Sequence, residues 1–323
     1  MGNMGMCKQP PNEEPEDTVP DERVLHPTSI RDAPKHSTSM LPADSKAIKL
    51  MNTNIDELLS PEIKQKLSEL GYKRRDFYGN LQVSFSRYPF IYRFKDEGEV
   101  YAGDLDENGL KNGLGRIIYR DGSYFEGEFK HGKIDGQGRL VHASLDIYEG
   151  EWHNNMAEGK GKSISSSGVL YEGMFKNDKP FGKGTETWPD GSVYTGEFTE
   201  GRKNGKGIFK WKDGAYYDGE FFWDNFNGKG TYSWPDGRLY KGEFKNNLMD
   251  GFGEFIWSNG QCYIGSYKED KKHGKGEMRL PNGSIFRGQF VEGKKEGEGI
   301  FIDEDGMENK GIWANDKFVQ WTN

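Results

Sequence analysis

The sequence predicts an all-β repeat array: an elongated, twisted, single-layer antiparallel sheet of consecutive β-hairpins, with a disordered N-terminal tail and one or two short N-terminal helices. The first observation is a Tyr-x-Gly-x-aromatic motif whose glycine recurs every 23 residues from Gly150 to Gly311. The second is composition, because 45 glycines and 14% aromatic residues accompany only 33% hydrophobic residues. Self-similarity at a fixed period is typical of repeat architectures. So few aliphatic side chains favour a single layer over a thick core.

Each repeat is predicted to form two short strands. Alternate residues of an extended strand share a face, so the rings and the glycine of 194–198 point the same way. The next apolar run, residues 207–211, alternates with lysines in the same manner. A polar, glycine-bearing link is expected at 199–205, and Asp213-Gly214 is a turn signal before the next repeat.

The glycine of the motif predicts the close approach of an aromatic ring. Glycine weakens a strand interior unless a bend or a close backbone approach requires it. Gly196 lies between Tyr194 and Phe198 on one face. We therefore expect a neighbouring ring to pack over its bare backbone.

These residues resemble the MORN repeats, whose pattern is Tyr-x-Gly-x-aromatic, then Gly-x-Gly, then Asp-Gly. The resemblance extends from Tyr101 to about Trp313, and departures are few: Asn309 lacks a ring, Leu105 replaces one, and Ser144-Leu145 stands for Asp-Gly. It implies a non-enzymatic scaffold, because such arrays resemble the repeat parts of junctophilins, ciliary radial spoke head proteins, plant phosphoinositide kinases and protist cytoskeletal rings.

Three regions are predicted along the chain. Residues 1–44 are rich in proline and acidic residues and are expected to be a disordered tether, because they cannot bury enough apolar surface to order themselves. Residues 45–87 are expected to form a short helical segment, and 88–323 the MORN-repeat sheet.

The helix of the second region has recognisable ends. Ser60 is a good N-cap, Pro61 suits the first turn, and Gly71 suits the position after the last turn. We expect this helix to cover the open first edge of the sheet, because exposed edges invite aggregation. Docking on a partner or a membrane surface, helped by the basic residues 73–75, is the alternative.

The two ends of the array are expected to be irregular. Residues 88–98 are predicted to supply a strand that leads into the first full repeat. At the other end, Ile312, Trp313, Phe318 and Trp321 are expected to fold back and close the last edge.

The first residues contain an acylation signal. With Met1 removed, Gly2 would be the N-terminal residue that myristoylation requires, and Cys7 is placed for palmitoylation beside it. Two acyl chains suffice for stable membrane anchoring, whereas one does not. Met6 departs from the usual Ser or Thr of the motif, so a plain Met-Gly start without a lipid is the alternative.

Several classes of chemistry are not predicted. We expect no catalytic residues, no metal site and no cofactor, because the regular repeats leave no insertion to house a site. Asp104 begins half of a calcium-binding loop, but Gly115 stands where the bidentate Glu is needed. A net charge of −8 disfavours nucleic-acid binding. The two cysteines, the missing signal-peptide core and the lack of about 18 consecutive apolar residues predict a cytoplasmic protein.

The aromatic ladder is the candidate site. A one-layer sheet is expected to leave part of its rings accessible as a groove for the apolar anchors of a peptide or helix. The groove residues predicted are Tyr194, Phe198, Trp211, Tyr217, Phe221, Trp234, Tyr240, Phe244, Trp257 and Tyr263.

The predicted function is a scaffold that docks a cytoskeletal or ciliary protein on this sheet, tethered to the cytoplasmic face of a membrane through Gly2 and Cys7. The first alternative is an axonemal structural subunit without a lipid. The second is a phosphoinositide-binding or lipid-kinase-regulating module. Self-association through the terminal repeats is compatible with each of the three.

Overall fold

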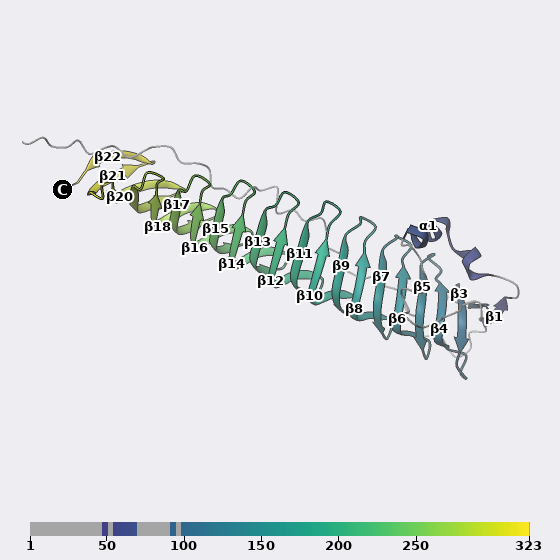
Figure 1. The fold of residues 1–323 in the computed structure, drawn as a ribbon. Helices are drawn as coiled ribbons and strands as arrows, with labels where there is room; N and C mark the ends of the chain where they lie inside the picture. The colour runs from purple at the N-terminus through teal and green to yellow at the C-terminus, as the bar shows by residue number, and fades with distance from the viewer. Residues whose placement is uncertain (1–46, 51–53, 70–90, 95–97, 323) are drawn as a thin grey trace, which may run out of the picture. The chain divides into compact units, whose positions relative to one another are not determined.

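The computed structural model describes residues 47–50, 54–69, 91–94 and 98–322. The described strands form one antiparallel sheet of 22 strands, and the described helical elements are the 3-10 turn η2 (Ile55–Leu58) and the helix α1 (Pro61–Glu69). Within each of two compact units, strands that are neighbours in sequence are neighbours in the sheet (Figure 1). The predicted fold class, consecutive antiparallel hairpins in one layer, is confirmed.

The N-terminal unit comprises residues 28–189 and 197–202, and the C-terminal unit includes 190–196 and 203–323. The strands of the first unit are β1 (Ala47–Leu50), β2 (Ile91–Phe94), β3 (Glu99–Leu105), β4 (Lys111–Ile118), β5 (Tyr124–Lys130), β6 (Lys133–Val141), β7 (Ile147–His153), β8 (Met156–Ile164), β9 (Leu170–Lys176) and β10 (Lys179–Thr187). The strands that follow are β11 (Val193–Thr199), β12 (Arg202–Lys210), β13 (Tyr216–Phe222), β14 (Asn225–Ser233), β15 (Leu239–Lys245), β16 (Leu248–Ile256), β17 (Cys262–Lys268), β18 (Lys271–Arg279), β19 (Ile285–Val291), β20 (Lys294–Ile302), β21 (Glu308–Ala314) and β22 (Lys317–Trp321).

The turn inside each repeat is tighter than predicted. β11 ends at Thr199 and β12 begins at Arg202, so the link expected over 199–205 is a two-residue turn. Asn177 and Asp178 show the geometry, with φ of 51° and 66°. Two central residues with positive φ match the twist of the flanking strands, which is why such turns join hairpins. The extra glycines instead mark bulges within the second strand of each repeat, as between Phe181 and Gly184.

The turn between repeats has the predicted chemistry. In Trp234–Gly237 the amide of Gly237 donates to the Trp234 carbonyl at 3.2 Å, and Gly237 has a φ of 91°. The amide of Arg238 donates to Asp236 Oδ1 at 3.1 Å, which fixes the loop. A type I turn followed by a left-handed glycine is a common three-residue hairpin connection.

The ring of each motif covers its own glycine, as the sequence predicted. Gly219 and Gly230 are cross-strand partners, and the Tyr217 side chain lies over both. A Cβ atom on Gly219 would lie 2.5 Å from the Tyr217 hydroxyl oxygen and 2.6 Å from the Gly230 Cα. The Tyr217 hydroxyl in turn donates to the carbonyl of Glu220 at 2.9 Å. Because neither glycine has a side chain, the Tyr217 ring can pack on the backbone of both strands at once.

These rings form the core of the sheet. We call the face that carries the motif tyrosines the aromatic face. In the C-terminal unit Tyr240 meets Phe244 edge to face, with 5.0 Å between centroids, and meets Tyr267 of the next repeat at 5.3 Å. Edge-to-face contacts bring the positive ring edge onto the negative ring face. The same contacts continue from repeat to repeat and replace the second layer that a sheet usually needs.

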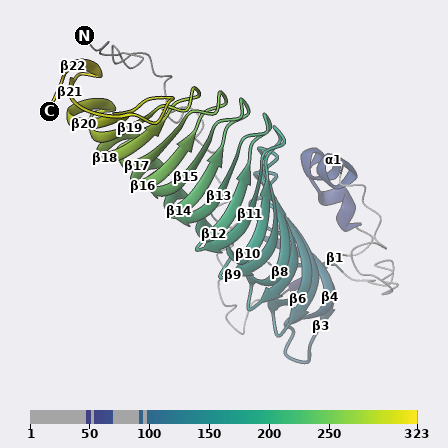
Figure 2. The ribbon, with the colours of Figure 1, turned by 60° about the vertical axis from the view of Figure 1, so that its left-hand side comes forward.

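The N-terminal helix lies on a face of the sheet and does not cover its edge. Leu59 and Ile63 pack against Tyr124, Val141 and Ile147 of β5–β7. Figure 1 shows α1 near the ends of β5 and β7, and Figure 2 shows it on one side of the sheet. The amide of Ile63 donates to the Ser60 hydroxyl at 3.3 Å, so the predicted N-cap is confirmed. The predicted place of α1 is wrong, because its apolar residues pack on the face of β5–β7, whereas near the first edge it is Ile55 of η2 that packs on Ile91, Val100 and Ala102.

The same packing explains one departure from the repeat pattern. Leu145 has a φ of 70°, a left-handed conformation that a branched residue seldom adopts. Its side chain packs against the cluster under α1. The apolar contact with the helix offsets the strain that glycine avoids in the other repeats.

The first end of the sheet differs in part from the prediction. Residues 47–50, expected at the start of a helical segment, form β1, which pairs with β2. The described part of 88–98 includes β2, which pairs with β3 as predicted. At the other end, Phe318 and Trp321 belong to β22, which adds a strand beside β21 and packs on the buried Trp313.

Candidate functional site

Each of the ten predicted groove residues lies on the aromatic face, but they are interior residues. Nine of them are no more than 3% exposed, and Trp211 is half-buried. Each ring is covered by rings of its own and neighbouring repeats, as Tyr217 is by Phe221 and Phe244. A partner could reach these faces only by displacing the core. The expectation that the rings line an open groove is revised, and their role in this structure is to hold the sheet together.

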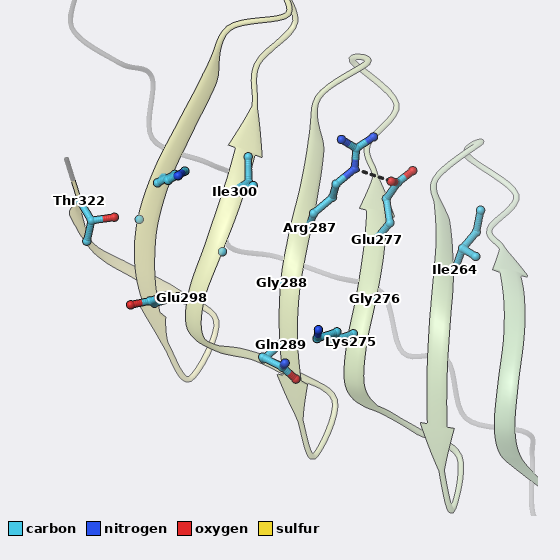
Figure 3. Close-up of a pocket in the computed structure, with 13 residues that line it drawn as sticks. Ile264, Lys275, Gly276, Glu277, Arg287, Gly288, Gln289, Glu298, Ile300 and Thr322 are labelled. Atoms are coloured by element: carbon cyan, nitrogen blue, oxygen red, sulfur yellow. Dashed lines mark hydrogen bonds and ion pairs between the residues drawn. The ribbon is translucent and has the colours of Figure 1, made fainter.

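A hollow of the C-terminal unit lies on the opposite side of the sheet. We call this the charged face, because its side chains alternate in sequence with the buried rings. A groove of about 770 Å³ crosses β17–β22 on this face, and Figure 3 shows its side chains rising from neighbouring strands. Gly276, Gly288, Gly299 and Gly311 contribute bare backbone to it. The glycines make room for the rings on the aromatic face. Because they have no side chains, they also leave a groove on the charged face.

One wall of the groove is a row of cross-strand neighbours. Ile264, Glu277, Arg287, Ile300 and Lys310 follow one another in register across β17–β21. Ile264 and Ile300 are half-buried, so each shows part of an aliphatic side chain to the groove. Aliphatic surface between charged groups suits the apolar anchors and polar flanks of a protein segment.

An ion-pair cluster fixes part of this wall. Glu277 accepts from Arg287 Nε and from Arg279 Nε, each at 2.6 Å. The Arg287 guanidinium, followed by that of Arg279, holds the pKa of the Glu277 carboxyl below its ordinary value. Glu277 is therefore ionised at neutral pH, and the cluster presents a net positive charge to the groove.

The second wall contains polar residues and leads toward an exposed ring. Lys275, Gln289 and Glu298 line it. Phe252 lies in the corresponding row of β16 and is 60% exposed. Most repeats carry lysine at its position, for example Lys206 and Lys229. Phe252 is an exposed aromatic residue that sequence reasoning missed, although its departure from the repeat pattern is readable in the sequence.

Sequence reasoning also missed a set of side-chain hydrogen bonds between consecutive hairpins. The second turn residue of a hairpin accepts, through its side chain, the amide of a residue in the preceding hairpin. Asn247 Oδ1 accepts from the Phe226 amide at 2.7 Å, while the Asn247 amide donates to the Phe226 carbonyl at 3.0 Å. The same side-chain bond is made by Asn155, Asp178, Asp224, Asp270 and Asp316. An Asn or Asp at the repeat period was the available signal.

The remaining predicted sites have varied outcomes. Gly2 and Cys7 lie outside the described residues. Asp106, part of the calcium-like loop, accepts the amides of Asn108 and Leu110 at 2.9 Å each and so closes a turn. Within the described ranges no group of three His, Cys, Asp or Glu side chains is arranged to hold a metal ion. None of the described helices is long and apolar enough to cross a membrane.

Fold and site together define a class of protein, an open sheet built from one hairpin unit. Nine segments match the MORN repeat: 101–124, 125–146, 148–169, 171–193, 194–216, 217–237, 240–262, 263–285 and 286–308. They cover more than half of the chain, which therefore belongs to the MORN repeat family.

Comparison with other proteins adds weaker likenesses. No curated protein sequence matches the chain. The TCP10 domain of Danio rerio CPAP in complex with a peptide of Danio rerio STIL is 10% identical at a TM-score of 0.41, over 69% of this chain and 98% of that chain. The same wild-type domain without the peptide is 12% identical at 0.36, over 72% and 98%. The Drosophila melanogaster SAS-4 TCP domain with a proline-rich motif of Ana2 is 13% identical at 0.24, over 55% and 85%. Likenesses this weak carry no conclusion about partners.

Proposed function

We propose that this chain is a non-enzymatic scaffold that docks a protein partner in the groove of the charged face across β17–β22. The observation that carries the proposal is the groove itself, about 770 Å³ of open volume lined by aliphatic, basic and acidic side chains. Specific interfaces combine an apolar centre with a polar rim. Ile264 and Ile300 supply the centre, and Lys275, Arg287 and Lys310 supply cations at the rim.

The aromatic face supports the same proposal indirectly. Its rings are buried against one another and hold the strands together. The surface left open to a partner is therefore the charged face. Phe252 extends that surface beyond the groove as an exposed aromatic ring, and aromatic residues are enriched among those that dominate binding energy. A cytoskeletal or ciliary partner remains the kind that the family resemblance favours.

Membrane tethering through Gly2 and Cys7 is a separate part of the proposal. Labelling the full-length chain with a clickable myristate analogue, beside Gly2→Ala, tests it. We expect label on the wild type and loss of membrane pelleting in the variant. A protein without label that stays in a detergent-resistant cytoskeletal fraction would favour the axonemal alternative without a lipid.

The docking proposal is tested by photo-crosslinking in cells. A benzophenone amino acid is placed at Gln289, which lines the groove, or at Lys212, an exposed turn residue outside it. We expect one discrete adduct from position 289, and its loss when Ile300→Glu is added. Thermal unfolding of each variant shows whether the fold is kept. Adducts that are the same from both positions, or that survive Ile300→Glu in a folded protein, would refute the groove as the docking site.

The phosphoinositide alternative predicts a different result. A lipid-binding sheet would bind anionic vesicles in proportion to their phosphoinositide content, whether or not Gly2 is present. The purified chain carrying Gly2→Ala, tested against vesicles with and without phosphoinositide, separates the two functions. Binding that depends on the lipid would favour the alternative.

A further inference from the structure

The charged face of the N-terminal unit already carries a helix. Tyr124, Val141 and Ile147 form an apolar row across β5–β7, with Tyr124 paired to Val141 and Val141 to Ile147 in register. The helix segment buries them to 2% exposure or less, and Ile63 itself is 2% exposed. This row is the seat of α1.

The repeat places a second row of the same kind in the C-terminal unit. Five repeats of 23 residues further along the chain, the same positions hold Leu239, Ile256 and Cys262. Their register is the same, because Leu239 pairs with Ile256 and Ile256 with Cys262. These three residues are half-buried, whereas their counterparts under α1 are fully buried. An apolar strip three strands wide therefore stays partly open, with Ser233 beside Leu239 and Arg279 beside Cys262 at its ends.

A cation lies beside this second seat. In the N-terminal unit Asp56 of η2 pairs with Arg116 of the sheet at 2.9 Å, next to the apolar row. In the C-terminal unit Lys241 projects from β15 on the same face, two residues from Leu239, and is exposed. Lys241 makes no ion pair with any described residue. Lys241 is the counterpart of Glu126, the cross-strand neighbour of Arg116, so a carboxylate on an incoming helix would pair with Lys241 much as Asp56 pairs with Arg116.

We propose that Leu239, Ile256 and Cys262 form a seat for an amphipathic helix of another protein, with aliphatic residues one turn apart and an acidic residue one turn before them. The proposal rests on the docking function but uses residues outside the groove wall. The α1 helix of a second copy is disfavoured, because leaving its own seat would expose Leu59 and Ile63 and break the Asp56–Arg116 pair for no net gain.

The test uses the full-length chain, labelled at its Ile, Leu and Val methyl groups for NMR. The probe is a lactam-stabilised peptide with the sequence of residues 54–69, the one segment whose fit to such a seat is observed. We expect saturable shifts of the Leu239 and Ile256 methyls and none at Val141 or Ile147. Ile256→Asp should abolish the shifts, and Lys241→Glu should weaken binding about 3-fold. Ile302→Asp, in the same row on β20, is the matched control and should bind like the wild type.

Each other outcome overturns the seat. Shifts confined to Ile264 and Ile300 would place the peptide in the groove, leaving the proposed docking function intact. Shifts at Val141 and Ile147 would mean exchange with α1. No shift at any methyl would leave the row without a helix partner. Shifts at Leu239 that grow with protein concentration alone would assign the row to a second copy.

Discussion

Phe226 stacks face to face on Tyr217, with 3.9 Å between ring centroids and 17° between planes. In the repeat two further on, Lys272 holds the same position, and its ammonium lies 5.8 Å from the centroid of Tyr263 and 5.2 Å from that of Trp257. The lysine is only 2% exposed. The aliphatic part and the ammonium of Lys272 thus cover neighbouring rings, as the Phe226 ring covers Tyr217.

Lys272→Ala tests whether this buried lysine is part of the core. We expect a loss of about 2 kcal/mol in unfolding free energy, from the cation–π contacts and the packing of the stem. Lys271→Ala is the matched control, because Lys271 is exposed and pairs with Glu292 at the surface. A solvent-screened pair of this kind contributes little, so this variant should unfold at nearly the same urea concentration as the wild type. Equal effects in urea unfolding would show that the buried position contributes nothing special.

Gly242→Ala should be among the most damaging single-methyl changes. The added Cβ would lie 2.4 Å from the Tyr240 hydroxyl oxygen and 2.6 Å from the Gly253 Cα, and Gly253 is backbone that cannot move aside. We expect about 3 kcal/mol of destabilisation from overpacking. Gly237→Ala, where only the left-handed φ of 91° is strained, should cost about 1 kcal/mol. A smaller loss at 242 than at 237, measured by denaturant unfolding, would contradict the ring-over-glycine packing.

Asn247→Gly should remove two inter-hairpin hydrogen bonds without straining the turn. Asn247 has a φ of 71°, which glycine adopts freely, so the loss is confined to its side chain. That side chain accepts from the Phe226 amide and donates to Asn225 Oδ1 at 2.6 Å. The cost expected is about 2 kcal/mol. Asn247→Ala adds left-handed strain and should cost about 3 kcal/mol. Gly201 and Gly293 hold the same position in other repeats, so glycine is compatible with the turn. A loss of unfolding free energy much larger than this in Asn247→Gly would contradict the role assigned to the Asn247 side chain.

Alkaline pH should destabilise the sheet through its buried phenols. Burial raises the pKa of Tyr148, Tyr171, Tyr217 and Tyr240 above the ordinary value. Unfolded tyrosines ionise near pH 10. Because the folded state keeps these protons, stability is full below about pH 10 and falls as the pH rises further.

Tyr217→Phe isolates one of these groups. Its unfolding free energy should fall less steeply above pH 10 than that of the wild type, by up to about 1.4 kcal/mol per pH unit. Phe125 and Phe286 occupy the equivalent position in other repeats, so the variant should fold. Urea midpoints at pH 8 to 11 provide the measurement. Identical pH slopes for variant and wild type would show that Tyr217 ionises as readily folded as unfolded.

The repeat pattern predicts most of the fold because spacing and alternation decide it locally. The tyrosine, the glycine and the second ring of the motif can share a face only in a strand, and Asp-Gly at a fixed offset can end that strand. The two-residue turns were missed because several glycines after Glu200 suggested a longer loop. In the structure Gly201 belongs to the turn and Gly205 to the bulged second strand. β1 was missed because residues 47–50 lie outside the repeats and do not contain the repeat motif.

The candidate site was harder to predict, since it depends on which rings are covered. Pattern alone shows that the tyrosines share a face, but not that neighbouring rings bury them. The groove lies where side chains are small or charged, and its apolar residues, such as Ile264 and Ile300, have no periodic signal. Leu145 illustrates the same limit: its departure from glycine is visible in the sequence, and its contact with α1 is not.

The most direct test compares the affinity of the crosslinked partner, once purified, for three forms of the full-length chain by calorimetry. The forms are wild type, Ile300→Glu in the groove and Tyr240→Phe in the aromatic core. We expect Ile300→Glu to weaken binding at least about 10-fold, the effect of losing one well-placed apolar contact of about 1.4 kcal/mol, and Tyr240→Phe to bind like the wild type. Weaker binding by Tyr240→Phe with unchanged binding by Ile300→Glu would return the docking site to the aromatic face.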